Sequence, residues 1–99
     1  MKRGRIMDNN YTKYNDMAEL LKVLSHPVRI CIVKGLLEKG ECNVSHMQDC
    51  LGMPQSTISQ HLQKLKSAGI IEGDRNGLQI NYHVCNKKAE QLIKILLNE

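Results

Sequence analysis

The sequence has no tryptophan, no phenylalanine and only three tyrosines, so its core must consist of leucine, isoleucine, valine and methionine side chains. Its 99 residues make one small domain, and a domain of this size buries only about 60 to 65% of the surface that its unfolded chain exposes. A thin aliphatic core gives limited stability. We therefore expect two copies to share apolar surface in a homodimer.

The sequence also lacks a run of about 18 apolar residues and a signal-peptide pattern, so we expect a soluble, cytoplasmic protein. In such a protein the four cysteines are expected to be reduced thiols and not a disulfide framework. No nucleophile, base and orienting group occur together, and there is no phosphate-binding glycine loop and no pair of acids. We therefore expect no enzyme activity.

Positive charge is concentrated at the start of the chain. The formal net charge is +4, and residues 1–14 hold four cations, among them Lys13, against the acid Asp8. These residues have no apolar periodicity, and we expect them to form a basic flexible arm. Either the arm contacts phosphates or a DNA minor groove, or it is a frayed terminus.

Apolar spacing predicts two helices after this arm. The first covers about residues 16–24, with Asn15 as the expected N-cap. The second begins at Ser25-His26-Pro27, because a cap and an early proline suit a helix start, and it continues to Gly40. Apolar residues on nearly all of its sides indicate a central, buried helix.

A helix-turn-helix follows. Asn43 can cap a short third helix over residues 44–51, preceded by no more than a stub of strand, and Gly52 can end that helix. Met53-Pro54 then turns the chain into an amphipathic helix over residues 54–68. A short helix, a glycine-containing turn and a second amphipathic helix are typical of this motif.

The helix over residues 54–68 has an apolar face and a polar face without acids. Ile58, Leu62 and Leu65 recur at i, i+4 and i+7. A solvated surface helix normally mixes glutamate with lysine. Here the polar positions carry amides, hydroxyls and cations, which bond to base edges and phosphate oxygens. We interpret this segment as the recognition helix of a DNA-binding domain.

A β-hairpin over residues 70–84 is predicted next. Ile80, Tyr82 and Val84 alternate with polar residues, as in a half-buried strand. Asn76-Gly77 is a tight-turn signal, since both residues tolerate positive φ. A hairpin directly after a recognition helix is a wing.

Asn86 can cap a last helix over residues 87–97. This helix and the first helix each carry an apolar stripe at helical spacing, and each stripe needs a partner. We predict that the two helices form the dimer interface. The predicted dimerisation residues are Met17, Leu20, Leu21, Leu24, Ala89, Leu92, Ile93 and Leu96.

Four segments, within about residues 20–84, indicate a protein family more specifically than the order of helices and strands does. They are LKVLSHPVRICIV, GE-x-NV, LGMPQSTISQHLQKLKSAGII and the wing ending NYHV. Together they resemble the ArsR/SmtB family of bacterial winged helix-turn-helix repressors, and the form PQST-x-SQHL is similar to the small PagR-type members. The resemblance implies a mainly α fold with a β-hairpin, and a homodimer that represses transcription on a palindromic double-stranded DNA operator.

A recognition helix of about 13 residues is roughly 20 Å long and fits along a major groove with its N-terminal turns near the bases. The predicted base-edge contacts are Gln55, Ser59, Gln60 and His61. The predicted phosphate and groove contacts are Ser56, Thr57, Lys64, Lys66, Arg75 and Asn76.

The metal ligands that the resemblance implies are missing here. The family motif GE-L-C-V-C-D has Asn43 and Ser45 at its two thiolate positions, with Cys42 in place of the leucine. In the family's last-helix site, Asn86 and Lys88 stand where an aspartate and a histidine are expected. We therefore expect no metal site and no cofactor.

The cysteines have neither C-x-C nor C-x-x-C spacing. They are Cys31, Cys42, Cys50 and Cys85. We interpret them as small buried hydrophobic residues, with a redox switch between thiols that meet in space as the alternative. Cys42 and Cys50 would lie about 12 Å apart along the third helix, beyond the reach of a disulfide.

Two alternatives to a simple repressor stay open at this point. One is a thiol-, redox- or metal-responsive derepressor of the same fold. The other is a winged-helix protein-interaction module that does not bind DNA, against which the polar face of residues 54–68 argues.

Overall fold

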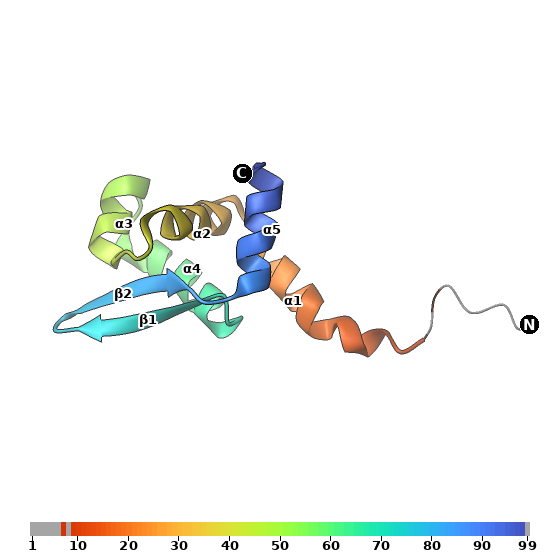
Figure 1. Cartoon of the computed structure of the whole chain (residues 1–99). Helices are drawn as coiled ribbons and strands as arrows, with labels where there is room; N and C mark the ends of the chain where they lie inside the picture. Colours follow the sequence, from red (N-terminus) through yellow and green to blue (C-terminus); the bar gives the residue numbers. More distant parts are fainter. Residues whose placement is uncertain (1–6, 8, 99) are drawn as a thin grey trace, which may run out of the picture.

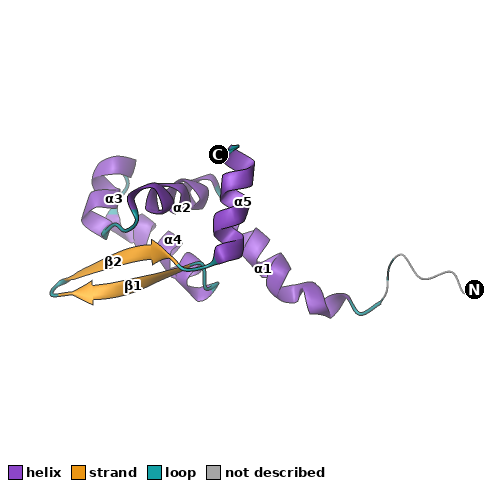
Figure 2. Cartoon of the chain, viewed as in Figure 1, coloured by secondary structure: helices purple, strands orange, loops and turns teal. Residues whose placement is uncertain are grey.

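The structure is a computed structural model that describes Met7 and residues 9–98. A 3-10 turn, η1 (Tyr11–Tyr14), leads into the helices α1 (Asn15–Leu24), α2 (Pro27–Lys39), α3 (Val44–Leu51) and α4 (Gln55–Ser67). The strands β1 (Ile71–Asn76) and β2 (Gln79–Val84) form an antiparallel hairpin, and α5 (Lys87–Leu97) follows (Figure 1). Figure 2 shows the hairpin projecting beside the helices. This is the predicted winged helix-turn-helix fold.

Helical structure begins earlier than the sequence predicted. The turn η1 covers Tyr11–Tyr14, so the end of the predicted arm is helical. Asn15 is the first residue of α1 and not its cap, because Tyr14 takes the N-cap position without a side-chain hydrogen bond. The basic residues Lys2, Arg3 and Arg5 lie outside the described residues, and a contact of this arm with DNA stays a prediction.

The other predicted helix ends are largely confirmed. Asn43 Oδ1 accepts the backbone N–H of His46 at 2.9 Å, and Asn86 Oδ1 accepts that of Ala89 at 3.0 Å. Gly52 ends α3 in the left-handed conformation. The cap of α2 is His26, with Pro27 as the first helical residue.

The core is aliphatic and centred on α2, which packs against α1, α4, α5 and β2. The inner face of α4 is at most 3% exposed, as its apolar spacing predicted. Val23 joins the core although the sequence did not mark it. The core side chains are Leu20, Val23, Leu24, Ile32, Val33, Leu36, Met47, Ile58, Leu62, Leu65, Ile70, Ile71, Ala89 and Ile93.

The wing has a different turn from the one predicted. β1 continues through Asn76, which pairs with Gln79, so Gly77 and Leu78 form the two-residue turn. Only Gly77 uses a positive φ there, of 69°. The prediction of an Asn76-Gly77 turn is therefore one residue out, because cross-strand pairing extends β1 past the first of two turn-forming residues.

Half of the predicted dimerisation set lies in the core of the single chain. Those residues are Leu20, Leu24, Ala89 and Ile93. This part of the prediction is wrong, because periodicity shows that a helix face is apolar but not which chain covers it. Leu92 is half-buried. The exposed members are Met17 at 52%, Leu21 at 51% and Leu96 at 71%, and Ile95, at 74%, lies beside them in sequence.

The described residues contain no helix long and apolar enough to cross a membrane.

A methyl group added at Gly73 should destabilise the wing. Its Cβ would lie 2.6 Å from Cγ2 of Ile80 and 3.0 Å from the ring of Tyr82. We expect Gly73→Ala to lower the free energy of unfolding by about 1–3 kcal/mol through overpacking, measured by urea denaturation. Gly35→Ala is the matched control: in the middle of α2 the same methyl meets nothing within 4 Å. The free energy of unfolding of Gly35→Ala should be about 0.5–1 kcal/mol higher than that of wild type. Equal stability of Gly73→Ala and Gly35→Ala would contradict the prediction.

Candidate nucleic-acid interface

The outer face of α4 is exposed, polar and free of acids. Burial of Ile58, Leu62 and Leu65 fixes the rotation of the helix and leaves the opposite side to solvent. Two further polar residues that the sequence analysis did not select, Gln63 and Ser67, share this face. The exposed polar residues of α4 are Gln55, Ser56, Ser59, Gln60, Gln63, Lys64, Lys66 and Ser67.

The N-terminus of α4 suits an anion. Pro54 precedes the helix in an extended conformation and has no side-chain cap bond. The first-turn N–H groups near Gln55 and Ser56 therefore point outward with the positive end of the helix dipole. Thr57 is half-buried, and its N–H bonds to the carbonyl of Pro54 at 3.1 Å.

A polar hollow of about 340 Å³ separates α4 from the wing. Gln55 and Ser59 line it from α4, Ser45 from α3, and Gln79 from β2. Asn43 Nδ2 donates to Oε1 of Gln79 at 3.3 Å, which ties the start of α3 to the wing. Ser45 and Gln79 were missed from the sequence, because neither lies on the recognition helix and only the fold brings them beside it.

A second hollow, of about 540 Å³, lies on the other flank of α4. Three cations line it, Lys22 of α1, Arg29 of α2 and Lys64 of α4, with Glu19 as the acid among its lining residues. Arg29 Nε donates to the carbonyl of Val23 at 2.7 Å. The grouping of Lys22 and Arg29 with Lys64 was not visible in the sequence, where 42 positions separate Lys22 from Lys64.

His61 points to the body of the protein and not to the outer face of α4. Its ring centroid lies 4.6 Å from that of His26, whose Nδ1 accepts the N–H of Val28. The ring packs α4 against the start of α2, and the predicted base contact by His61 stays a prediction. Burial, followed by the charges of His26, Arg29 and Lys64, lowers the pKa of His61 below its ordinary value.

The tip of the wing exposes Arg75 and Asn76, and their contact with a groove stays a prediction. The two acids at its base have a partner. Nε2 of His83 lies 3.0 Å from a carboxylate oxygen of Glu72, and Nδ1 lies 3.5 Å from one of Asp74. When His83 is protonated, it offsets the negative charge that these two acids would present to a phosphate.

The cysteines were predicted to be buried, but most of them are exposed. Cys31, Cys50 and Cys85 are exposed, Cys42 is half-buried, and all four are free thiols. The fold brings Cys31, Cys42 and Cys50 to one hollow between α2 and α3. No group of three or more His, Cys, Asp or Glu side chains among the described residues is arranged to hold a metal ion.

Known proteins match most of this chain. Residues 24–74 match a family model described as a helix-turn-helix domain. The transcriptional repressor PagR of Bacillus anthracis is 42% identical over 86 residues, which cover 87% of this chain and 86% of that protein. A biofilm growth-associated repressor of Xylella fastidiosa is 45% identical over 82 residues, or 83% of this chain and 71% of that protein.

Solved structures have the same fold. The crystal structure of PagR superposes with a TM-score of 0.79 at 41% identity, covering 88% of this chain and 99% of that one. A homodimeric winged helix-turn-helix DNA-binding domain from Mycobacterium bovis, titled a possible ArsR-family transcriptional regulator, gives a TM-score of 0.78 at 28% identity. The match covers 97% of this chain and 87% of that one.

His61→Gln should make stability less sensitive to acid. Because the pKa of His61 is lower in the folded chain, the unfolded chain binds more protons once the pH falls below about 6.5. Neutral His61 makes its full contribution to the free energy of unfolding above that pH. This contribution is lost as the pH falls toward the pKa that His61 has in the folded chain. We expect wild type to lose more unfolding free energy than His61→Gln between about pH 7.5 and about pH 5.5.

The measurement is urea denaturation at both pH values, with His46→Gln as the control. His46 is exposed on α3 and makes no contact with His26 in the structure. This control should retain the full pH dependence of wild type. A His61→Gln profile parallel to wild type would contradict the assignment.

Proposed function

Because this chain belongs to the ArsR/SmtB family of winged helix-turn-helix transcriptional repressors, we propose that it represses transcription by binding a palindromic operator as a homodimer. One observation carries the proposal: the exposed face of α4 consists of amides, hydroxyls and lysines without an acid. These groups bond to base edges and phosphates. The face is held outward by the buried inner side of the same helix.

In the proposed complex, α4 lies in the major groove with its N-terminal turns at the bases. Its 13 residues span roughly 20 Å. Gln55, Ser59 and Gln60 contact base edges, and a glutamine can bond to adenine N6 and N7 together. The polar hollow between α4 and the wing places Gln79 and Ser45 beside these side chains.

In the proposed complex, DNA phosphates lie on both sides of these base contacts. The uncapped start of α4 at Gln55 and Ser56 receives one phosphate. Lys64 and Lys66 approach the backbone near the end of the helix, and Arg75 and Asn76 at the wing tip approach the adjacent groove. Since the net charge of the chain is only +4, affinity depends on this local placement of cations.

The dimer forms through the exposed apolar side chains of α1 and α5. Met17 and Leu21 on α1 and Ile95 and Leu96 on α5 are each at least half exposed in the single chain. Burial of such side chains in a partner gives association its main driving force. A protein-interaction module without DNA binding would have no need of the acid-free face on α4.

Gln60→Ala and Lys64→Ala should weaken DNA binding in different ways. The glutamine change should reduce discrimination between operator and random DNA by about 1–3 kcal/mol, because it removes base contacts. The lysine change should weaken both DNAs similarly and lower the slope of log affinity against log salt by about one, because it removes a phosphate contact. The operator sequence comes from selection out of a random DNA pool, and affinities from fluorescence anisotropy at several salt concentrations.

Matched controls lie on α5, where Gln91 and Lys88 are exposed and line neither of the hollows that flank α4. Gln91→Ala and Lys88→Ala should bind operator as wild type does. Equal affinity of the wild-type protein for operator and random DNA at matched salt would refute sequence-specific repression.

Leu21→Glu combined with Leu96→Glu should convert the dimer into a folded monomer. Both side chains are mostly exposed in the single chain, so a charge costs little there but is unfavourable in a buried interface. Sedimentation equilibrium measures the mass, and circular dichroism checks the fold. Leu78→Glu, at the fully exposed wing tip, is the control and should leave the mass dimeric. A double variant with dimeric mass would place the interface elsewhere.

A further inference from the structure

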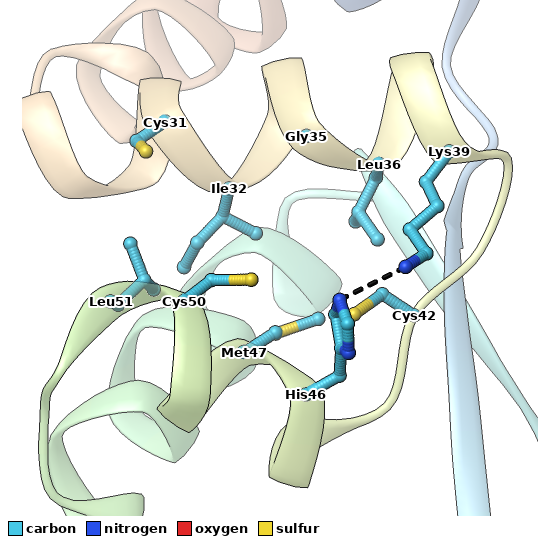
Figure 3. Close-up of a pocket in the computed structure, with 10 residues that line it drawn as sticks. All are labelled: Cys31, Ile32, Gly35, Leu36, Lys39, Cys42, His46, Met47, Cys50 and Leu51. Atoms are coloured by element: carbon cyan, nitrogen blue, oxygen red, sulfur yellow. Dashed lines mark hydrogen bonds between the residues drawn. The ribbon is translucent and has the colours of Figure 1, made fainter.

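A hollow of about 150 Å³ lies between α2 and α3, away from the exposed face of α4. Figure 3 shows Ile32 and Leu36 of α2 and Met47 and Cys50 of α3 directed into the space between these helices. Ile32, Leu36 and Met47 are buried core residues, so the inner wall is apolar. A volume near 150 Å³ with apolar walls is enough to hold a benzene-sized molecule.

Gly35 keeps the α2 side of this hollow open. It lies in the interior of α2, where glycine is less favourable than alanine. A Cβ added at Gly35 would meet nothing within 4 Å, so close packing does not require a glycine here. The space that a larger side chain could fill is therefore left to the hollow.

Sulfur atoms give the hollow its chemical character. Cys31, Cys42, Cys50 and Met47 all line it, whereas none of the chain's three tyrosines does, and the chain has no phenylalanine or tryptophan. Sulfur packs favourably against the edge of an aromatic ring. Burial raises the pKa of the Cys42 thiol; the charge of Lys39 opposes this rise and the nearby Cys50 adds to it.

The mouth of the hollow carries one cation. Lys39 at the end of α2 donates to Nε2 of His46 at 2.9 Å, and both side chains are exposed (Figure 3). A hydroxyl or carboxylate oxygen at the edge of a bound ring would meet this ammonium group.

We propose that this hollow binds a small aromatic molecule, a single ring with at most one hydroxyl or carboxylate group. The ring lies between α2 and α3 among the sulfur-containing side chains of the lining, and its polar substituent bonds to Lys39 at the mouth. Size, apolar walls, sulfur lining and the single cation at the mouth together select this class.

Occupancy should also weaken operator binding, a step that rests on the proposed function. Met47 is the buried residue of α3, so this helix is held to α2 by few contacts, while it also packs directly on α4. A ring bound in the hollow adds contacts between α2 and α3, which restricts the movement of α3 and with it the adjustment of α4 to the groove.

The direct test is an NMR titration of the full-length protein with phenol, benzoate and cyclohexanol up to millimolar concentrations. Phenol should give saturable shifts at Cys31, Gly35, Met47 and Cys50, whereas cyclohexanol, which has similar size but no aromatic ring, should bind several-fold more weakly. Lys39→Ala should weaken the binding of benzoate more than the binding of phenol. Shifts that are absent, or that do not saturate, would overturn the proposal.

Gly35→Leu fills the hollow and should weaken phenol binding about tenfold or more. If that variant does not fold, Gly35→Ala serves instead and should weaken binding several-fold while the protein gains stability. Cys50→Ser should weaken phenol, whereas Cys85→Ser, outside the hollow, should not. Unchanged binding in the Gly35 and Cys50 variants would place the ligand elsewhere and overturn the assignment.

The coupling is tested by operator affinity with and without phenol. Wild type should bind operator more weakly in saturating phenol, and Gly35→Leu should bind it equally in both conditions. Saturable phenol binding without a change in operator affinity would overturn the coupling but not the site. Absence of operator binding in every condition would instead refute the proposed function, which the titration does not depend on.

Discussion

The interface depends on the packing of one aliphatic row, Ile58, Leu62 and Leu65, against the core. These side chains are 3% exposed or less. Burial of each leucine or isoleucine contributes about 1.5–3 kcal/mol, so a rotation of α4 that exposed them would cost several times the gain from any single surface hydrogen bond. The row therefore fixes which side of α4 faces outward, and the acid-free polar face follows from that rotation.

Hydrogen bonds hold the wing at its base, whereas the side chains at its tip are exposed. Cys42 exchanges both backbone hydrogen bonds with Tyr82, and Cys85 N–H donates to the carbonyl of Ile70. These bonds join the hairpin to the loop before α3 and to the end of the helix-turn-helix. Arg75 and Leu78, by contrast, project into solvent. A wing anchored in this way can hold its position relative to α4 while its tip reaches a groove.

The sequence was sufficient for features that depend on local pattern. Asn43 and Asn86 were predicted as caps because a cap depends on a few adjacent residues, and the row on α4 was predicted because burial imposes helical spacing. Features that depend on which distant residues meet were missed. The direction of His61 depends on His26, 35 positions earlier, and the burial of Leu20 and Ile93 depends on whether the same chain covers them. The presence of Cys31 and Cys50 at one hollow likewise depends on how α2 and α3 pack.

α2 is the element that all of these sites share. Its start holds α4 through His26 and His61, and its middle packs on α5, whose outer side carries the exposed apolar residues. Its remaining side, at Gly35, faces α3 across a hollow instead of a fully packed contact. Close-packed contacts transmit displacement whereas a hollow absorbs it. The contact of α2 with α3, the first helix of the helix-turn-helix, is thus incompletely filled. A molecule that filled it would act on the DNA-binding unit while leaving the contact of α2 with α5 intact.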